Sequence, residues 1–289
     1  MILWQGLGSG GSPGFLRRPV CACGQAGGGK VSEVPASDVP SDPAAAGGQQ
    51  GKQPGPIIAV DGPAGAGKST LARRVAQALG FRYLDTGAMY RAVTWAALAK
   101  GILPQQATPD ALRQVAQSIV VRVSPDSRHV WVDDTEVTGF IREPRVNQAV
   151  SWVARVPGVR EQLVRQQREW AAGGNVVVDG RDIGTVVFPG AELKLFLTAS
   201  PAERARRRWR ELVQQGYQVE LGELERQVEE RDHLDSGRAV APLRPAEDAV
   251  VVDSTGRSVN EVVAEVLREC ERRGISSCTD SCTGSSGSC

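Results

Sequence analysis

The chain has few of the features that a membrane protein or a general nucleic-acid binder needs. Aromatic residues make up 5% of its 289 residues, and no apolar run approaches the roughly eighteen residues that cross a bilayer. With 34 basic and 33 acidic residues the formal net charge is +1, whereas general binding to nucleic acid depends on a strong basic excess. We therefore expect neither a nucleic-acid nor a membrane partner.

Cysteines and targeting signals are also scarce. The six cysteines lie near the two ends of the chain, at Cys21, Cys23, Cys270, Cys278, Cys282 and Cys289. No C-x-x-C pair has a matching second pair, so we expect unpaired thiols in flexible tails rather than structural zinc. The start of the chain lacks a basic segment followed by an apolar one, which predicts a cytoplasmic protein without a signal peptide.

Two tails flank one expected folded unit. Residues 1–55 are rich in Gly, Pro, Ser and Ala and poor in large apolar side chains, so burial cannot offset the entropy of ordering them. Residues 275–289 have the same character. We expect both tails to be disordered and the domain to span 56–274, which is long enough for one α/β domain with an insert.

Strands and helices alternate within this unit. Short apolar runs predict buried strands at Ile57–Val60, Phe81–Leu84, Val176–Asp179, Leu193–Leu197 and Ala249–Asp253. Helices are predicted at Lys68–Leu79, which Gly80 ends, at Val259–Arg272, and after Leu197, where Ser200 and Glu203 form a capping-box pattern. This order predicts an α/β fold with a five-stranded parallel sheet flanked by helices.

One segment departs from this alternation. Apolar residues recur with period two between Ile119 and Ile141, with a turn at 124–127 and a third short strand near Glu136–Gly139. The pattern predicts an antiparallel meander. It lies in an expected insert over about 101–170, and inserts in such folds commonly cover the substrate.

A glycine-rich turn after the first strand fits the phosphate-loop pattern G-x-x-x-x-G-K-[ST]. The expected nucleotide-binding residues are Gly62, Pro63, Ala64, Gly65, Ala66, Gly67, Lys68, Ser69 and Thr70. Backbone N–H groups in such a loop converge on phosphate oxygens, Lys68 would reach the β- and γ-phosphates of ATP, and the Ser69 hydroxyl would ligate Mg²⁺. A second glycine-rich stretch, Gly24–Lys30, lacks the Ser/Thr and both flanking elements, so we regard it as a chance match.

The pattern leaves the reaction open, because several classes of protein use a phosphate loop. No N-K-x-D guanine-reading motif occurs, which argues against a GTPase.

Six segments in order resemble the bacterial-type cytidylate (CMP) kinases, a branch of the nucleoside monophosphate kinase family of P-loop kinases. They are D-G-P-A-G-A-G-K-S-T at Asp61, D-T-G-A-M-Y-R at Asp85, P-G-V-R at Pro157, D-G-R-D-I-G-T-V-V-F-P at Asp179, R-D-H-L-D-S-G-R-A-V-A-P-L at Arg231 and D-S-T at Asp253. The match spans nearly the whole expected domain and neither tail. It implies Mg²⁺-ATP-dependent phosphoryl transfer to CMP and dCMP, giving CDP and dCDP, and we expect a monomer.

The resemblance also implies roles for the acceptor side. Arg91 and Arg181 look like the pair that grips the acceptor phosphate, which the planar fork of a guanidinium suits. The positions that match the base site are Thr86, Arg160, Asp182 and Arg238, and those that match the sugar site are Ser151, Arg231 and Asp235.

Hydrogen-bonding chemistry indicates which base the site would accept. The Asp182 carboxylate can accept a hydrogen bond from the N4 amine of cytosine but would face an oxygen on uracil, which favours CMP over UMP. Asp179 resembles a Walker-B acid that helps to hold the metal. Without the resemblance, Arg160 would read as part of a solvated basic face with Arg165 and Arg168, and Asp179 and Asp182 as turn residues.

An arginine-rich helix is expected to form a short lid over about 201–220. Phosphoryl transfer is catalysed mainly by positioning and charge neutralisation. We therefore expect Arg204 and Arg208, one turn apart, to act beside Lys68, Arg91 and Arg181.

Two rival functions stay open. One is another small-molecule P-loop kinase, for UMP, AMP or shikimate. The other is a nucleotide-gated RNA- or partner-binding module that uses the basic helix and the tails, although this helix lacks the interleaved aromatics that stack on bases.

Overall fold

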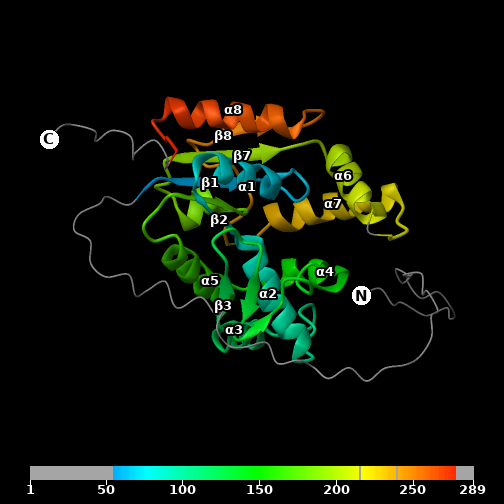
Figure 1. The fold of residues 1–289 in the computed structure, drawn as a ribbon. Helices are drawn as coiled ribbons and strands as arrows, with labels where there is room; N and C mark the ends of the chain where they lie inside the picture. The colour runs from blue at the N-terminus through cyan, green and yellow to red at the C-terminus, as the bar shows by residue number, and fades with distance from the viewer. Residues whose placement is uncertain (1–54, 215, 239, 278–289) are drawn as a thin grey trace, which may run out of the picture.

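A five-stranded sheet forms the centre of the computed structural model, which describes residues 55–214, 216–238 and 240–277. Its order is β2-β6-β1-β7-β8 and every pairing is parallel (Figure 1). The strands are β1 (Ile57–Asp61), β2 (Arg82–Asp85), β6 (Val176–Asp179), β7 (Leu193–Thr198) and β8 (Val250–Asp253). The predicted parallel sheet is confirmed. The expectations for residues 1–54 and 278–289 lie outside the described residues.

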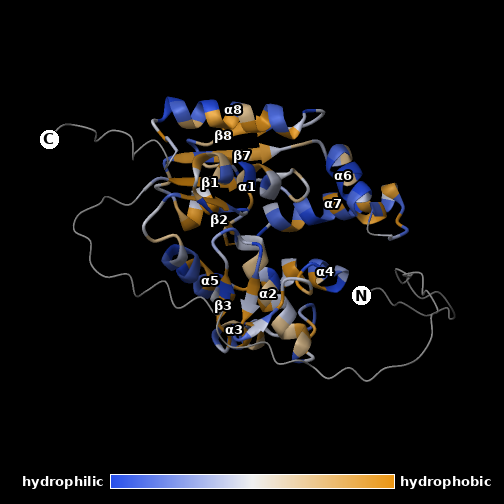
Figure 2. Cartoon of the chain, viewed as in Figure 1, coloured by the Kyte–Doolittle hydropathy of each residue, from blue (hydrophilic) through white to orange (hydrophobic). Residues whose placement is uncertain are grey.

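Helices cover both faces of the sheet. Side chains of a strand alternate between faces, so Ile58 and Val60 pack against α1 (Lys68–Leu79) and α8 (Val259–Arg272). Ala59 lies in the opposite cluster, with α2 (Thr86–Ala99) and α5 (Pro157–Trp170). This two-sided burial explains why the strands are continuous apolar runs. Figure 2 shows them as the most apolar layer, between helices with polar outer sides.

Along the chain, α2 is followed by α3 (Pro109–Gln117), a second sheet and α4 (Pro144–Val153) before α5 begins. The second sheet is an antiparallel meander of β3 (Val121–Val123), β4 (Val130–Val132) and β5 (Thr135–Glu136), as predicted. Its third strand ends at Glu136 rather than near Gly139. The reason is that the Thr138 hydroxyl, not a strand carbonyl, accepts the hydrogen bond from the Val130 N–H at 2.9 Å.

Helices α6 (Pro201–Gln214) and α7 (Leu221–Ser236) form a lobe at one end of the sheet (Figure 1). A small apolar cluster of Ala205, Leu224 and Val228 holds them together.

The capping box expected before α6 is only half formed. The Ser200 Oγ accepts from the Glu203 N–H at 3.2 Å. The Glu203 carboxylate, however, accepts from Arg207 Nε at 3.0 Å, because the arginine lies one turn away on the same helix. A complete capping box occurs at the start of α8, between Ser258 and Glu261.

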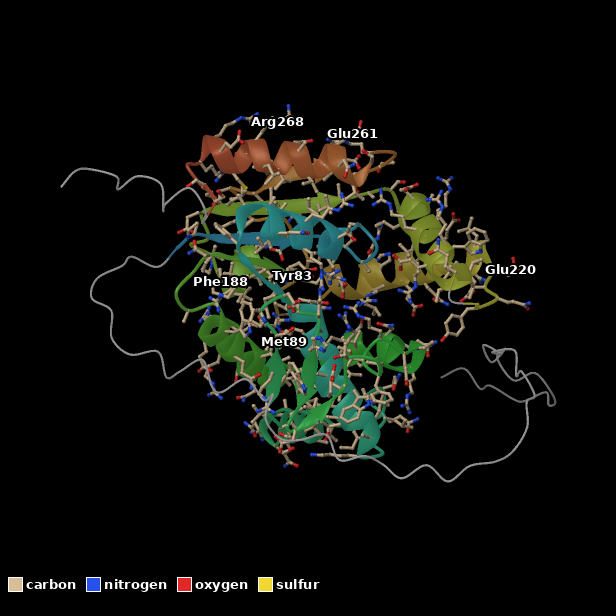
Figure 3. All side chains as sticks on the ribbon, viewed as in Figure 1. Tyr83, Met89, Phe188, Glu220, Glu261 and Arg268 are labelled. Carbon is tan, nitrogen blue, oxygen red and sulfur yellow. The ribbon has the colours of Figure 1, made fainter. Side chains whose placement is uncertain are left out.

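The end of the domain also differs from the expectation. Ile275, assigned to the disordered tail, is 4% exposed in the core, and its N–H donates to the Cys270 carbonyl at 2.9 Å. Cys270 is itself a core residue rather than a tail thiol, and burial raises its pKa to about 11. In Figure 3, Glu261 and Arg268 lie on the outer side of α8, away from this core. Among the described helices, none has the length and apolar character that a bilayer span requires.

Candidate functional site

A cavity of about 1080 Å³ opens at the carboxyl ends of β1, β2 and β6, and residues of α1, α2, α4, α5, α6 and α7 also line it. This edge of a parallel sheet is where α/β proteins bind ligands. The cavity brings together most of the residues that the sequence singled out: Ala64, Gly65, Ala66, Gly67, Lys68, Ser69, Thr70, Thr86, Arg91, Ser151, Arg160, Asp179, Arg181, Asp182, Arg208, Arg231, Asp235 and Arg238. Gly62, Pro63 and Arg204 do not line it.

The phosphate loop owes its shape to glycines in the left-handed region. Gly62 has φ +143°, and a Cβ there would lie 2.0 Å from the Leu197 carbonyl oxygen of β7, so no other residue fits. Gly67 has φ +94° and begins α1 without any side-chain cap. The first N–H groups of α1 are therefore available to an anion.

Lys68 is buried beside this loop. Its Nζ donates to the Pro63 carbonyl at 2.7 Å. Burial, together with the nearby positive charge of Arg181, lowers the pKa of Lys68 well below its ordinary value. A negatively charged ligand in the cavity would offset both effects, because it would pair with the ammonium group.

Two arginines of helix α6 form hydrogen bonds with the backbone of the phosphate loop. Arg204 donates to the Ala64 carbonyl at 3.2 Å and Arg207 donates to the Ala66 carbonyl at 3.1 Å. In a trans peptide the N–H of the following residue points opposite to the carbonyl. Holding these two carbonyls on the α6 side therefore turns the N–H groups of Gly65 and Gly67 away from it, which suits a phosphate cradle.

Sequence reasoning missed Arg207 and misplaced Arg204. Arg207 lines the cavity and also donates to the Ser254 Oγ at 3.0 Å. Arg204, expected to contact the transferring phosphoryl group, is 3% exposed, and its donors are occupied by carbonyls and by Asp232. The helical spacing places both on α6 but does not say which one faces the cavity.

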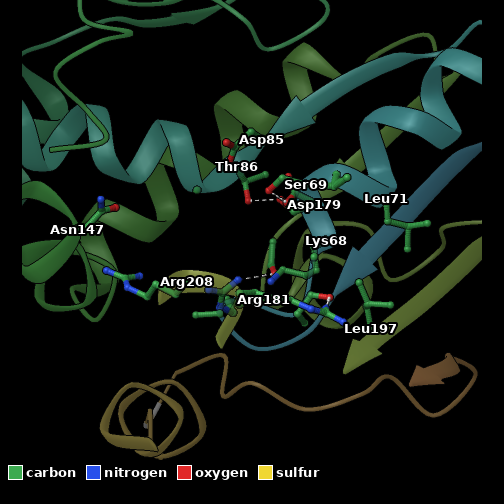
Figure 4. A pocket seen from close by; sticks show the side chains of 18 of the residues that line it. Lys68, Ser69, Leu71, Asp85, Thr86, Asn147, Asp179, Arg181, Leu197 and Arg208 are labelled. Carbon is green, nitrogen blue, oxygen red and sulfur yellow. Dashed lines mark hydrogen bonds between the residues drawn. The ribbon is translucent and has the colours of Figure 1, made fainter. Parts of the chain in front are cut away.

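A hydroxyl and a carboxylate lie together beside the loop. The Ser69 Oγ donates to Asp179 Oδ2 at 2.8 Å (Figure 4). The Tyr83 phenol donates to Asp179 Oδ1 at 3.0 Å. Burial and the neighbouring Asp85 charge raise the pKa of Asp179 to about 6.

These oxygen donors fit Mg²⁺, which takes few protein ligands and relies on phosphate and water for the rest. The described residues contain no group of three or more His, Cys, Asp or Glu side chains that could hold a metal ion.

Across the cavity, Arg160 of α5 and Asp182 form an ion pair that is buried on both sides, with side-chain exposures of 5% and 6%. The guanidinium also lies 5.9 Å from the Tyr90 ring. The alternative that Arg160 belongs to a solvated face is therefore wrong, whereas Arg165 on the same helix is 64% exposed.

Asp61, at the end of β1, fixes the turn that carries Asp182. Its two carboxylate oxygens accept from the N–H groups of Ile183 and Gly184 at 2.8 and 2.7 Å. Burial raises the pKa of Asp61 to about 6. The turn continues into a short π-helix, Ile183–Val187, so the backbone after β6 is set by a side chain from the neighbouring strand.

Helix α7 contributes further charged residues to the cavity. Asp235 is 1% exposed and accepts from Arg181 Nε at 3.0 Å and from Arg238. Burial alone would raise its pKa, but Arg181 and Arg238 hold it below the ordinary value. Burial, followed by the charge of Arg181, lowers the pKa of Arg231 to about 9.

Asp85 connects α2 to the insert. It caps α2 by accepting from the Ala88 N–H at 2.9 Å, and its other oxygen accepts from Arg91 at 2.8 Å and from Arg142 at 3.1 Å. Burial opposes ionisation, but Arg91 and Arg142 hold the pKa of Asp85 below its ordinary value. Sequence reasoning missed Arg142, because it lies 57 residues from Asp85 and no local pattern links them.

The P-loop class of nucleotide-binding proteins is defined by a strand, a glycine-rich phosphate loop and a helix in that order, with a hydroxyl–carboxylate pair beside the loop. The cytidylate kinase family model matches residues 58–272, and the chain belongs to that family.

Similar proteins with curated names belong to the same family. The chain is 52% identical over 216 residues to the cytidylate kinase of Desulforamulus reducens, covering 74% of this chain and 96% of the relative. It is 48% identical over 214 residues to the cytidylate kinase of Streptococcus thermophilus, covering 73% and 94%. It also matches the bifunctional pantoate ligase/cytidylate kinase of Synechococcus sp., 51% identical over 217 residues, but spans only 40% of that protein.

Proposed function

We propose that this chain transfers the γ-phosphoryl group of ATP to CMP and dCMP, giving ADP with CDP or dCDP. The observation that carries the proposal is that one cavity is lined both by the phosphate loop and by the buried Arg160–Asp182 pair. A donor loop alone would fit many P-loop proteins, and the charge cluster opposite it is what a nucleoside monophosphate requires.

The chain's own residues would act mainly by position and charge. The loop N–H groups and Lys68 hold the donor phosphates, and Arg91 and Arg181 hold the acceptor phosphate so that its oxygen lies in line with the γ-phosphorus. Arg208, which lines the cavity from α6, supplies positive charge where negative charge spreads in the transition state. No covalent intermediate is needed.

Ser69 and Asp179 are the residues that would hold Mg²⁺. When bound, the ion neutralises charge on the ATP phosphates.

Base recognition would depend on the Arg160–Asp182 pair. The pair presents a carboxylate acceptor beside guanidinium donors, which complements the N4 amine, N3 and O2 of cytosine. Uracil would place O4 against the carboxylate, leaving a buried acceptor without a donor. We therefore propose CMP and dCMP as preferred acceptors, with Arg238 and Thr86 at the base and Ser151, Arg231 and Asp235 at the sugar.

Thr86 already donates its hydroxyl proton to the Asp179 carbonyl at 2.7 Å. A contact from Thr86 to the base would therefore use the lone pairs of the hydroxyl as acceptors.

We also propose that the chain acts as a cytoplasmic monomer. Every residue of the proposed mechanism comes from one chain, so a second copy is not needed to complete the site.

Separation of the reaction products tests the proposal. Purified protein is incubated with ATP, Mg²⁺ and CMP, and the nucleotides are separated by anion exchange. We expect ADP and CDP in equal amounts, and neither in the absence of CMP. Absence of CDP would overturn the proposal. If the protein instead binds RNA with a steep salt dependence, the RNA-binding rival is favoured.

A further inference from the structure

Arg204 occupies an unusual position for an arginine. It lies at the first turn of α6, its side chain is 3% exposed, and it forms a bidentate ion pair with Asp232 at 3.0 and 2.6 Å. The same guanidinium donates to the Ala199 carbonyl at 2.9 Å and to the Ala64 carbonyl at 3.2 Å. Four hydrogen bonds therefore fix one side chain against three segments of the chain.

The phosphate loop packs closely on this arginine. A Cβ on Gly65 would lie 3.2 Å from the Arg204 Cβ, with the loop residue at φ +77°. Such contact leaves little room for the loop to move without α6. The donor side of the cavity is thus tied to the position of Arg204 by both packing and a hydrogen bond.

Asp232 connects Arg204 to the acceptor side. It lies on α7 directly after Arg231 and three residues before Asp235, and both neighbours line the cavity. Asp235 in turn holds Arg181 and Arg238. A displacement of α7 would therefore reach the residues that are proposed to bind the acceptor.

We propose that the Arg204–Asp232 pair is a positioning link that couples the binding of the two nucleotides. Neither side chain lines the cavity, so both act through the loop and the helix that they join. A donor that fixes the phosphate loop also fixes α7 through this pair, and the acceptor then binds to a site that is already ordered. This inference rests on the proposed function, since it needs two nucleotides in one cavity.

Asp232→Asn is the main test variant. Asparagine has nearly the same volume as aspartate but lacks the charge and one acceptor oxygen. The Asp232 side chain is 28% exposed. Arg204→Lys is the second variant, because lysine keeps the charge but cannot form the fork. The matched control is Arg206→Ala on the same helix, which removes an exposed arginine that lies 3.7 Å from Glu203.

The measurement is the dissociation constant of CMP by calorimetry, alone and with saturating Mg²⁺ and β,γ-imido-ATP. For the wild type and Arg206→Ala we expect CMP to bind about tenfold tighter when the analogue is present, within the usual range of coupling between sites. For Asp232→Asn and Arg204→Lys we expect the factor to fall below about twofold, while CMP alone binds within about twofold of the wild type. The affinity for the analogue should rise by the same factor when CMP is present, since coupling is reciprocal.

The outcomes separate the two claims. If the wild type binds no CMP, the proposed function fails and the inference falls with it. If the wild type shows the coupling and both link variants retain it, only the inference is overturned. A lower melting temperature with an unchanged coupling factor would likewise overturn the inference, because that is what a merely structural pair would do.

Discussion

Arg160 on α5 and Asp182 after β6 form an ion pair that is buried on both sides, at the wall of the cavity that the phosphate loop also lines. A buried charge is tolerated only when a partner compensates it. Asp182 is held in place by its neighbours Ile183 and Gly184, which donate to Asp61 of the adjacent strand. The fold thus holds the pair in place, and such preorganisation would favour the selective base recognition that we propose for it.

The first prediction concerns Asp182→Asn. The substitution removes the charge that compensates Arg160 and replaces one of the two acceptor oxygens with an NH2 donor, so kcat/KM for CMP should fall by about 100-fold. KM for ATP should stay within about twofold, because the residue is proposed to bind the acceptor rather than ATP. Coupled detection of ADP measures both.

The control for this variant is Arg165→Ala. Arg165 lies on the same helix as Arg160 but is 64% exposed, so its loss should leave both constants unchanged. Equal losses for CMP and ATP in Asp182→Asn would mean that Asp182 does not belong to the acceptor site.

The second prediction concerns Arg207→Ala on α6. The variant loses the hydrogen bonds to the Ala66 carbonyl and to Ser254, so the phosphate loop is less well held. We expect KM for ATP to rise about tenfold while KM for CMP changes little. Initial rates with each substrate varied in turn measure the effect. A rise confined to CMP would contradict the role of Arg207 behind the loop.

The third prediction concerns the metal. Asp179→Asn removes the carboxylate that accepts from the Ser69 hydroxyl. ADP should bind the wild type more tightly with Mg²⁺ than with EDTA, and this difference should shrink by about tenfold or more in the variant. Calorimetric titration of ADP under both conditions gives the result without any turnover. An unchanged metal effect would show that Asp179 does not help to hold the ion.

The fourth prediction concerns pH and stability. The pKa of Asp61 is about 6 in the folded protein, whereas its ordinary value is 3.8. Between these values the folded state binds more protons than the unfolded state, so the free energy of unfolding falls as pH rises. From pH 5 to pH 7 the loss due to Asp61 should be about 1 kcal/mol.

Urea denaturation at pH 5 and pH 7 measures this effect in the wild type and in Asp61→Asn. The variant is expected to be less stable at both pH values, because it loses an acceptor for the turn at Ile183. Its loss between the two pH values should be smaller than that of the wild type by about 1 kcal/mol. An identical loss in the two proteins would show that Asp61 does not titrate in this range.

Local patterns predicted much of this fold. The apolar runs predicted all five parallel strands, and Gly80, at φ +67°, ends α1 where the sequence places its stop. The position of the phosphate loop between β1 and α1 was predictable because its spacing is local and its glycines have a steric reason, whereas nucleotide binding by its residues stays a prediction.

Features that depend on distant partners were not predictable in the same way. Glu203 pairs with Arg207 rather than completing a cap, Ile275 joins the core, and Arg142 meets Asp85 across 57 residues. Arg204 and Arg207 sit one turn apart in an arginine-rich helix, and only tertiary packing decides which of them reaches the cavity.

The comparison of acceptors tests the central claim most directly. Values of kcat/KM are measured for CMP, dCMP, UMP and AMP at saturating Mg²⁺-ATP with coupled detection of ADP. We predict that CMP and dCMP exceed UMP and AMP by at least about tenfold, because uracil places O4 where cytosine has its N4 amine, and the two-ring base of AMP is larger than the pyrimidine proposed for this site. Turnover of UMP or AMP equal to or faster than that of CMP would contradict the account.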